Sequence, residues 1–143
     1  MKYKMYIHDK IGDRNHGYLI SIDKKFIEFN IARIYYIYNV PKNTTRGYHA
    51  HKNLKQILFC PIGQIVFSLD DGVDKTTIVL DSPEKTLFIG PGIWREIRWA
   101  SKKSVLVVLA SEPFEENDYI RNYEEYIKLV QEGYWSDNDE NSI

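Results

Sequence analysis

The amino-acid sequence predicts an all-β protein that ends in a single α-helix. Between residues 31 and 110, short apolar or alternating runs are separated by turns rich in Gly, Pro and Asp, a pattern typical of a β-sandwich, jelly roll or barrel. After residue 115, the apolar residues change to the spacing of an amphipathic helix. The length of 143 residues fits one domain, which we expect to span residues 1–132.

The predicted strands follow from alternation and from the turns between them. Residues 3–22 are expected to form one or two short strands around two glycine turns. The strongest candidate, 31–40, is rich in β-branched and aromatic residues, and its alternation places Arg33, Tyr35 and Ile37 on one face. The remaining predicted strands are 54–63, 64–69, 75–80, 86–89, 93–99 and 104–110.

The C-terminal helix is predicted over about residues 115–131, where apolar side chains recur every three or four positions. Glu115 and Glu116 lie near its expected start, where acidic side chains interact favourably with the helix dipole. Gly133 is a plausible stop. We expect residues 133–143, which are polar and acidic, to form a disordered tail.

Composition excludes several classes of protein. The formal net charge of −1 gives no sign of a nucleic-acid partner. No run of apolar residues approaches the roughly 20 needed to span a membrane, and the N-terminus lacks the apolar stretch of a signal peptide. The single cysteine, Cys60, rules out an internal disulfide and fits a reducing compartment. The sequence therefore predicts a cytoplasmic protein with neither nucleic acid nor membrane as a partner.

Two histidines mark the stretch that carries the chemistry, Arg46-Gly47-Tyr48-His49-Ala50-His51-Lys52. Side chains at positions i and i+2 of a strand point to the same side, so His49 and His51 share a face if this stretch is extended. A His-x-His pair in a small β-domain indicates either metal ligation or acid–base catalysis in a cavity.

The spacing around this pair resembles the motifs of the cupin superfamily, whose fold is a small jelly-roll β-barrel. In the cupin metal site, a glutamate and a third histidine complete the ligand set. Here Gln56 stands in place of the glutamate and Arg95 in place of the third histidine. An arginine stays protonated at neutral pH, so it cannot ligate a metal and would repel a divalent cation. We therefore expect a cupin domain with no metal and no other cofactor, whose cavity suits an anionic or carbonyl-rich substrate.

Longer segments resemble one metal-free cupin family, the nucleoside-diphospho-4-keto-6-deoxyglucose 3,4-ketoisomerases. The resemblance implies an isomerase that converts dTDP-4-keto-6-deoxy-D-glucose to a dTDP-3-keto-6-deoxyhexose, which feeds 3-amino sugars into bacterial surface glycans such as the O-antigen of lipopolysaccharide. It also implies a homodimer whose subunits exchange N-terminal strands. The likeness rests on the order and spacing of residues 33–37, 46–52, 80–83, 89–96, 108–112 and 118–123.

The family resemblance assigns catalytic roles to three side chains. His49 would be the base that removes the proton at C3 of the sugar, and a neutral imidazole with a reference pKa of ~6.5 is well matched to that task. Tyr35 would shuttle a proton near C4. His51 would orient the sugar or share the proton transfer.

Six further residues are candidates for substrate binding. Arg46 would hold the pyrophosphate, but it is out of phase with His49 on an ideal strand, so we expect it at the cavity rim or before Gly47. Arg33 is a second cationic candidate, and Arg95 would stabilise the enediolate oxygen or anchor the substrate. His16 and Arg95 align with positions that vary in the family, and they leave the product configuration at C4 unassigned. The set is Arg33, Arg46, Arg95, His16, Lys52 and Gln56.

Three other functions compete with the isomerase. A nucleotide-sugar 3,5-epimerase also uses Arg-Gly-x-His in a jelly roll, but such chains are usually longer and lack the His-x-His-Lys run. A non-catalytic sugar-binding cupin would use the cavity without turnover. A metal-dependent cupin enzyme would contain stoichiometric iron, zinc or manganese.

Overall fold

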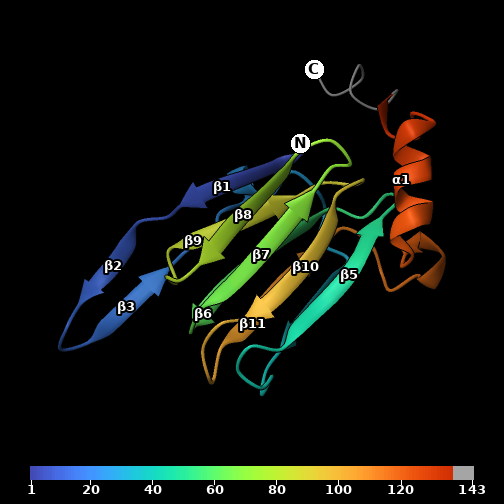
Figure 1. Cartoon of the computed structure of the whole chain (residues 1–143). Coiled ribbons are helices and arrows are strands. Elements are labelled where there is room, and N and C mark those ends of the chain that lie inside the picture. The colour runs from blue at the N-terminus through green and yellow to red at the C-terminus, as the bar shows by residue number, and fades with distance from the viewer. Residues whose placement is uncertain (137–143) are drawn as a thin grey trace.

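The computed structural model describes residues 1–136 and consists of two five-stranded antiparallel sheets that face each other (Figure 1). The first sheet has the order β1 (Tyr3–Ile7), β9 (Lys85–Ile89), β6 (Gln56–Ile62), β11 (Val105–Ala110) and β4 (Arg33–Ile37). The second has the order β12 (Tyr119–Ile120), β5 (Thr45–His51), β10 (Trp94–Trp99), β7 (Ile65–Asp70) and β8 (Lys75–Leu80). Non-consecutive strands are thus neighbours in both sheets, as in a jelly roll, and the predicted fold class is confirmed.

The hydrophobic core lies between the two sheets because each strand turns alternate side chains inward. Leu58 and Leu87 of the first sheet meet Phe67 and Trp99 of the second, and all four are buried. Each such side chain contributes roughly 1.5–3 kcal/mol to folding. Strand β4 shows the predicted alternation: Tyr35 lies partly buried on the inner face, whereas its neighbours Ile34 and Tyr36 are 61% and 64% exposed. The alternation predicted for residues 31–40 is therefore confirmed over Arg33–Ile37, but the strand is shorter than the predicted run.

The helix begins later than the sequence predicted. Residues Glu116–Asp118 form a 3₁₀ turn, η2, and Tyr119–Ile120 form β12, which pairs with β5. The helix α1 spans Tyr123–Gln131, and its N-cap residue Asn122 accepts a hydrogen bond from the Glu125 N–H. The prediction of a helix from 115 was wrong because the spacing of apolar residues carries no information about strand pairing, and here Tyr119 and Ile120 pair with β5.

The folded domain also extends past residue 132. Trp135 is buried, packs against Tyr126 of α1, and donates a hydrogen bond from Nε1 to the carbonyl of Lys52 (3.1 Å). The predicted disordered tail therefore began too early, because an aromatic residue beyond Gly133 returns to the barrel. Residues 137–143 of that predicted tail lie outside the described residues.

The N-terminal region forms three strands, the first of which, β1, is an edge of the first sheet. The other two, β2 (Lys10–Asp13) and β3 (Gly17–Ile20), pair only with each other and extend away from the barrel (Figure 1). A short 3₁₀ turn, η1 (Lys24–Phe26), follows the hairpin. No helix within residues 1–136 is long and apolar enough to cross a membrane.

Candidate active site

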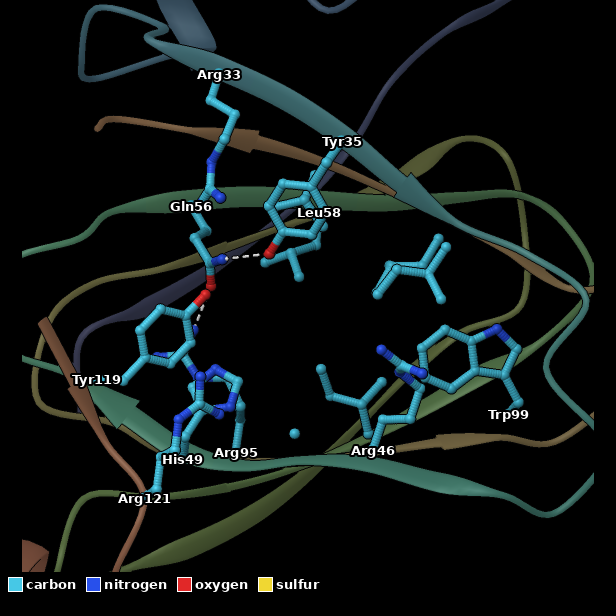
Figure 2. A pocket seen from close by; sticks show the side chains of 15 residues that line it. Arg33, Tyr35, Arg46, His49, Gln56, Leu58, Arg95, Trp99, Tyr119 and Arg121 are labelled. Carbon is cyan, nitrogen blue, oxygen red and sulfur yellow. Dashed lines mark hydrogen bonds between the residues drawn. The ribbon is translucent and has the colours of Figure 1, made fainter. Parts of the chain in front are cut away.

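A cavity of about 260 Å³ opens between the two sheets and is lined by both apolar and polar side chains. Leu58 and Trp99 are among the apolar ones. Figure 2 shows that the polar side chains of Gln56, His49 and Arg95 converge at one end. Six of the nine predicted site residues line this cavity: Arg33, Tyr35, Arg46, His49, Gln56 and Arg95.

A β-bulge brings Arg46 and His49 to the same face of β5. His49 pairs with Arg95 and Gly47 with Glu96, so Tyr48 has no partner in the ladder with β10. Both Gly47 and Tyr48 have positive φ angles, +92° and +55°, and a Cβ at Gly47 would approach the Arg95 carbonyl oxygen to 2.9 Å. The extra residue reverses the alternation beyond it. Arg46 therefore shares the cavity face with His49, and it remains exposed, in agreement with the predicted rim position.

The two histidines of the pair differ in what surrounds them. His49 lines the cavity, whereas His51 is fully buried behind it and donates from Nδ1 to Oδ2 of Asp118 (2.9 Å). Their rings meet edge to face with centroids 4.8 Å apart. The Asp118 carboxylate also accepts the Asn53 N–H (2.7 Å), so it is held in place from two directions. This arrangement leaves His49 to face a substrate and gives His51 a fixed tautomer with the proton on Nδ1.

Burial keeps both imidazoles neutral. Burial, followed by the positive charge of Arg95, lowers the pKa of His49 to about 3. Burial likewise lowers the pKa of His51 to about 4, against the opposing effect of its hydrogen bond to Asp118. Burial alone would raise the pKa of Asp118, but the hydrogen bonds from His51 and Asn53 hold it below its usual value. At neutral pH the site therefore holds an uncharged imidazole with a free ring nitrogen that can act as a base.

Gln56 connects the two walls of the cavity. Its Nε2 donates to the phenolic oxygen of Tyr35 (2.9 Å), and its Oε1 accepts a hydrogen bond from Nη1 of Arg95 (Figure 2). Arg95 also donates from Nη2 to the carbonyl of Ile93 (2.9 Å). Burial lowers the pKa of Arg95 to about 10, so the guanidinium remains charged at neutral pH. Arg95 and Gln56 thus occupy the positions of the two absent cupin ligands and bond to each other.

Positive charge dominates the cavity. Arg33, Arg46, Arg95 and Arg121 all line it, and none of its described lining residues is acidic. Within residues 1–136, no three His, Cys, Asp or Glu side chains gather closely enough to hold a metal ion. Such a charge distribution favours an anionic ligand, for which arginine fork geometry is well suited.

The structure adds three residues that the sequence analysis did not assign to the site. Tyr119 lines the cavity, and its ring lies 5.0 Å from that of His49 and 4.4 Å from that of His51. Arg121 stacks over the Tyr119 ring at 4.2 Å. Asp118 orients His51. The resemblance included residues 118–123, which was a usable signal, but periodicity had placed this segment in a helix.

Two predicted site residues lie elsewhere in the chain. Lys52 does not line the cavity. Its backbone N–H donates to the carbonyl of Asp118, and its own carbonyl accepts from Trp135, so it helps to join β5 to the C-terminal segment. His16 lies in the turn of the β2–β3 hairpin, where its side chain is 84% exposed and contacts Asp13 (3.0 Å). Neither residue reaches the cavity of its own chain.

The family model described as FdtA: WxcM-like, C-terminal, matches residues 1–131. The chain belongs to this family. A TDP-4-oxo-6-deoxy-α-D-glucose-3,4-oxoisomerase of Aneurinibacillus thermoaerophilus is 41% identical over 131 residues, which cover 91% of this chain and 94% of that protein. The predicted family and the prediction of an isomerase are both confirmed by this match.

Solved structures of FdtA-like 3,4-ketoisomerases superpose on this chain. QdtA from Thermoanaerobacterium thermosaccharolyticum, a sugar 3,4-ketoisomerase in complex with TDP, is 41% identical with a TM-score of 0.85, over 91% of this chain and 95% of that one. A 3,4-ketoisomerase from Helicobacter canadensis is 42% identical with a TM-score of 0.86, over 92% and 98%. A dTDP-4-dehydrorhamnose 3,5-epimerase from Bacillus anthracis, only 15% identical with a TM-score of 0.74 over 82% and 77%, shares the fold.

Proposed function

We propose that this protein converts dTDP-4-keto-6-deoxy-D-glucose to a dTDP-3-keto-6-deoxyhexose in the cavity between its sheets. The observation that carries the proposal is a neutral His49 facing a cavity lined by arginines. The FdtA-family relatives supply the substrate class: QdtA has been crystallised with TDP, and a variant of it with a histidine replaced by asparagine has been crystallised with TDP-4-keto-6-deoxyglucose.

The proposed reaction begins at C3 of the sugar. His49 accepts the C3 proton and leaves an enediolate across C3 and C4, whose negative charge the Arg95 guanidinium stabilises. Tyr35 gives its phenolic proton to C4 and takes up the proton of the O3 hydroxyl. His49 returns its proton to O4. One C–H and one O–H bond break at C3, and one of each forms at C4, so protons and electrons balance without a cofactor.

The pyrophosphate of the substrate would bind to the arginines. Arg46 enters the cavity from the bulge in β5, and Arg33 enters from the facing strand β4 (Figure 2). The Arg33 guanidinium lies 4.9 Å from the centre of the Tyr35 ring, so this second cationic group contacts the proposed proton donor. Charge-assisted hydrogen bonds to phosphate oxygens are roughly twice as strong as neutral ones.

We also propose that the protein is a homodimer that exchanges its N-terminal strands. The β2–β3 hairpin pairs with no other strand of the described chain and exposes Ile11, Tyr18 and Leu19. Two edge strands, β1 and β4, terminate the first sheet. A hairpin laid against a second subunit would cover these apolar side chains and would carry His16 toward that subunit. A cytoplasmic location is part of the same proposal, supported by the unpaired, buried Cys60.

NMR of dTDP-4-keto-6-deoxyglucose incubated with the protein in D₂O tests the proposed reaction. We expect a 3-keto product that carries deuterium at C4, and its C4 coupling constants will give the configuration. The His49→Asn variant should bind TDP but lose the reaction. Deuterium at C3 and C5 with the ketone still at C4 would instead identify an epimerase. Binding without any exchange would identify a sugar-binding module.

A further inference from the structure

The Gln56 side chain lies between the two groups that would stabilise and protonate the enediolate. It is 2% exposed, and it extends from the start of β6 in the first sheet across to Arg95 of β10 in the second. One end of its amide contacts the guanidinium and the other contacts the Tyr35 hydroxyl, 2.9 Å away. In the sequence, Gln56 is the residue that replaces the metal-binding glutamate of other cupins.

The chemistry of these neighbours determines which way the amide points. A guanidinium has five N–H donors and no acceptor, so only the amide oxygen can face Arg95. The amide nitrogen must then face Tyr35, and it can only donate. The phenolic oxygen of Tyr35 is therefore the acceptor in this contact.

This direction leaves the Tyr35 proton free. A tyrosine hydroxyl has one proton, and the Gln56 N–H occupies the oxygen as an acceptor. Arg33, stacked on the Tyr35 ring, also has only donors. Within residues 1–136, the Tyr35 hydroxyl forms no hydrogen bond besides the one from Gln56. The Tyr35 side chain lines the cavity. The O–H bond is thus available to a ligand in the cavity.

We propose that Gln56 is a positioning residue that orients a one-way hydrogen-bond chain, Arg95 to Gln56 to Tyr35, so that the Tyr35 hydroxyl donates its proton into the cavity. This inference rests on the proposed 3,4-isomerisation. Gln56 itself touches no reacting atom; it acts through Tyr35. The role differs from the direct contact with substrate that the sequence analysis assigned to Gln56.

The groups around Tyr35 also stabilise the phenolate that remains when its hydroxyl loses the proton. Burial raises the pKa of Tyr35, and the charges of Arg95 and Arg33 and the hydrogen bond from Gln56 oppose that rise. A phenolate formed by proton transfer to C4 keeps the Gln56 N–H as a donor, so no group has to reorient during the step. Preorganised donors of this kind cost no rearrangement when charge develops.

A glutamate at this position would reverse the second hydrogen bond. Its carboxylate would accept from Arg95 and from Tyr35, and the Tyr35 proton would then point away from the cavity. Gln56→Glu preserves the size and shape of the side chain, so it changes the direction of the hydrogen bond and the charge beside Arg95 but not the packing. The proposal thus gives a reason for glutamine at this position: its amide can donate a hydrogen bond to Tyr35, which a carboxylate cannot.

The test compares two rates in D₂O with dTDP-4-keto-6-deoxyglucose and a chelator present. Deuterium appearing at C3 of the remaining substrate measures removal of the C3 proton, and the 3-keto product measures completed transfer to C4. For Gln56→Glu we expect product formation to fall about 100-fold more than C3 exchange, as for loss of a general acid. C3 exchange itself should also slow, because the carboxylate offsets the Arg95 charge that stabilises the enediolate. Tyr35→Phe should give the same pattern, and the double variant should show little further loss.

The controls distinguish failure of the positioning role of Gln56 from failure of the proposed isomerase activity. Gln64→Glu, which makes the same charge change at an exposed loop position, is the matched control and should behave as wild type. A proportional fall in both rates for Gln56→Glu, or an unchanged product rate, would overturn the positioning role. If the buried carboxylate prevents folding, Gln56→Met, which has neither donor nor acceptor of comparable strength, must still raise the ratio of exchange to product. A wild-type protein that forms no 3-keto product would instead refute the isomerase itself.

Discussion

The cavity and the β2–β3 hairpin differ in which side chains they bury and which they expose. In the cavity, polar groups such as Gln56 and Arg95 are buried, and they find hydrogen-bond partners within one chain. On the hairpin, apolar side chains such as Ile11 and Leu19 are exposed and have no cover from the barrel. In the proposed dimer, a second subunit would cover the hairpin, whereas the polar groups of the cavity already have partners within one subunit. The predictions below test each half of this contrast.

The largest effect is expected from Asp118→Asn, which tests whether the buried polar groups act as one unit. An asparagine can present its NH₂ to Nδ1 of His51, which would favour the wrong tautomer. We expect turnover to fall about 10- to 100-fold with TDP affinity unchanged. Steady-state kinetics and calorimetry measure the two quantities. Asp74→Asn, at an exposed loop position between β7 and β8, is the control; an Asp118→Asn enzyme with wild-type turnover would rule out the positioning of His51.

The next effect concerns the cationic side of the cavity. Arg46→Met should raise KM for the dTDP-sugar about tenfold with little change in kcat, because it removes a charge-assisted contact to the pyrophosphate made equally before and during reaction. Arg98→Met makes the same charge change on the exposed outer face of β10 and should leave KM unchanged. A lower kcat with unchanged KM would move Arg46 from binding to catalysis.

Acid should destabilise the fold through the same buried imidazoles. His49 and His51 have pKa values of about 3 and about 4 in the folded protein, below the ~6.5 of an unfolded chain, so the unfolded state binds more protons between these limits. Stability is therefore fully present above about pH 6.5 and is lost as the pH falls toward 4, by up to about 1.4 kcal/mol per pH unit for each group.

Thermal unfolding measured from pH 4 to pH 7 checks this expectation. His49→Gln should flatten the dependence, whereas His16→Gln, at the exposed hairpin turn, should reproduce the wild-type slope. The acid limb of kcat/KM should also lie well below pH 6.5, since the base is neutral in the free enzyme. A wild-type Tm that is independent of pH over this range would contradict the buried, neutral state of both rings.

The smallest effect tests the hairpin. Leu19→Ala should weaken the dimer about fivefold, because it removes roughly 0.5 kcal/mol of apolar burial from each of the two exchanged arms, or about 1 kcal/mol per dimer. Analytical ultracentrifugation measures the dissociation constant. Val73→Ala, an exposed apolar residue away from the hairpin, is the control and should leave the dimer unchanged. A wild-type protein that stays monomeric at micromolar concentration would show that the exposed hairpin serves some other partner.

Some positions in the site could be predicted from the sequence, and others could not. The shared face of Tyr35 and Arg33 followed from alternation along a β-branched, aromatic strand, and the structure shows that this face lines the cavity. The pairing of Gln56 and Arg95 in one place followed from motif spacing. The start of the helix did not follow, because residues 116–120 satisfy a helical pattern while β5 holds them as a turn and a strand.

The sequence by itself determined the β-rich architecture, the His-x-His strand and the replacement of two metal ligands by glutamine and arginine, because each is written in neighbouring residues or short spacings. Only the tertiary structure decided that a bulge at Tyr48 brings Arg46 into the cavity, and that Asp118 meets His51 across 67 residues of chain. It also decided the direction of the amide of Gln56 between Arg95 and Tyr35. These features depend on strand register and on which side chains meet across the barrel, and local periodicity carries no information about either.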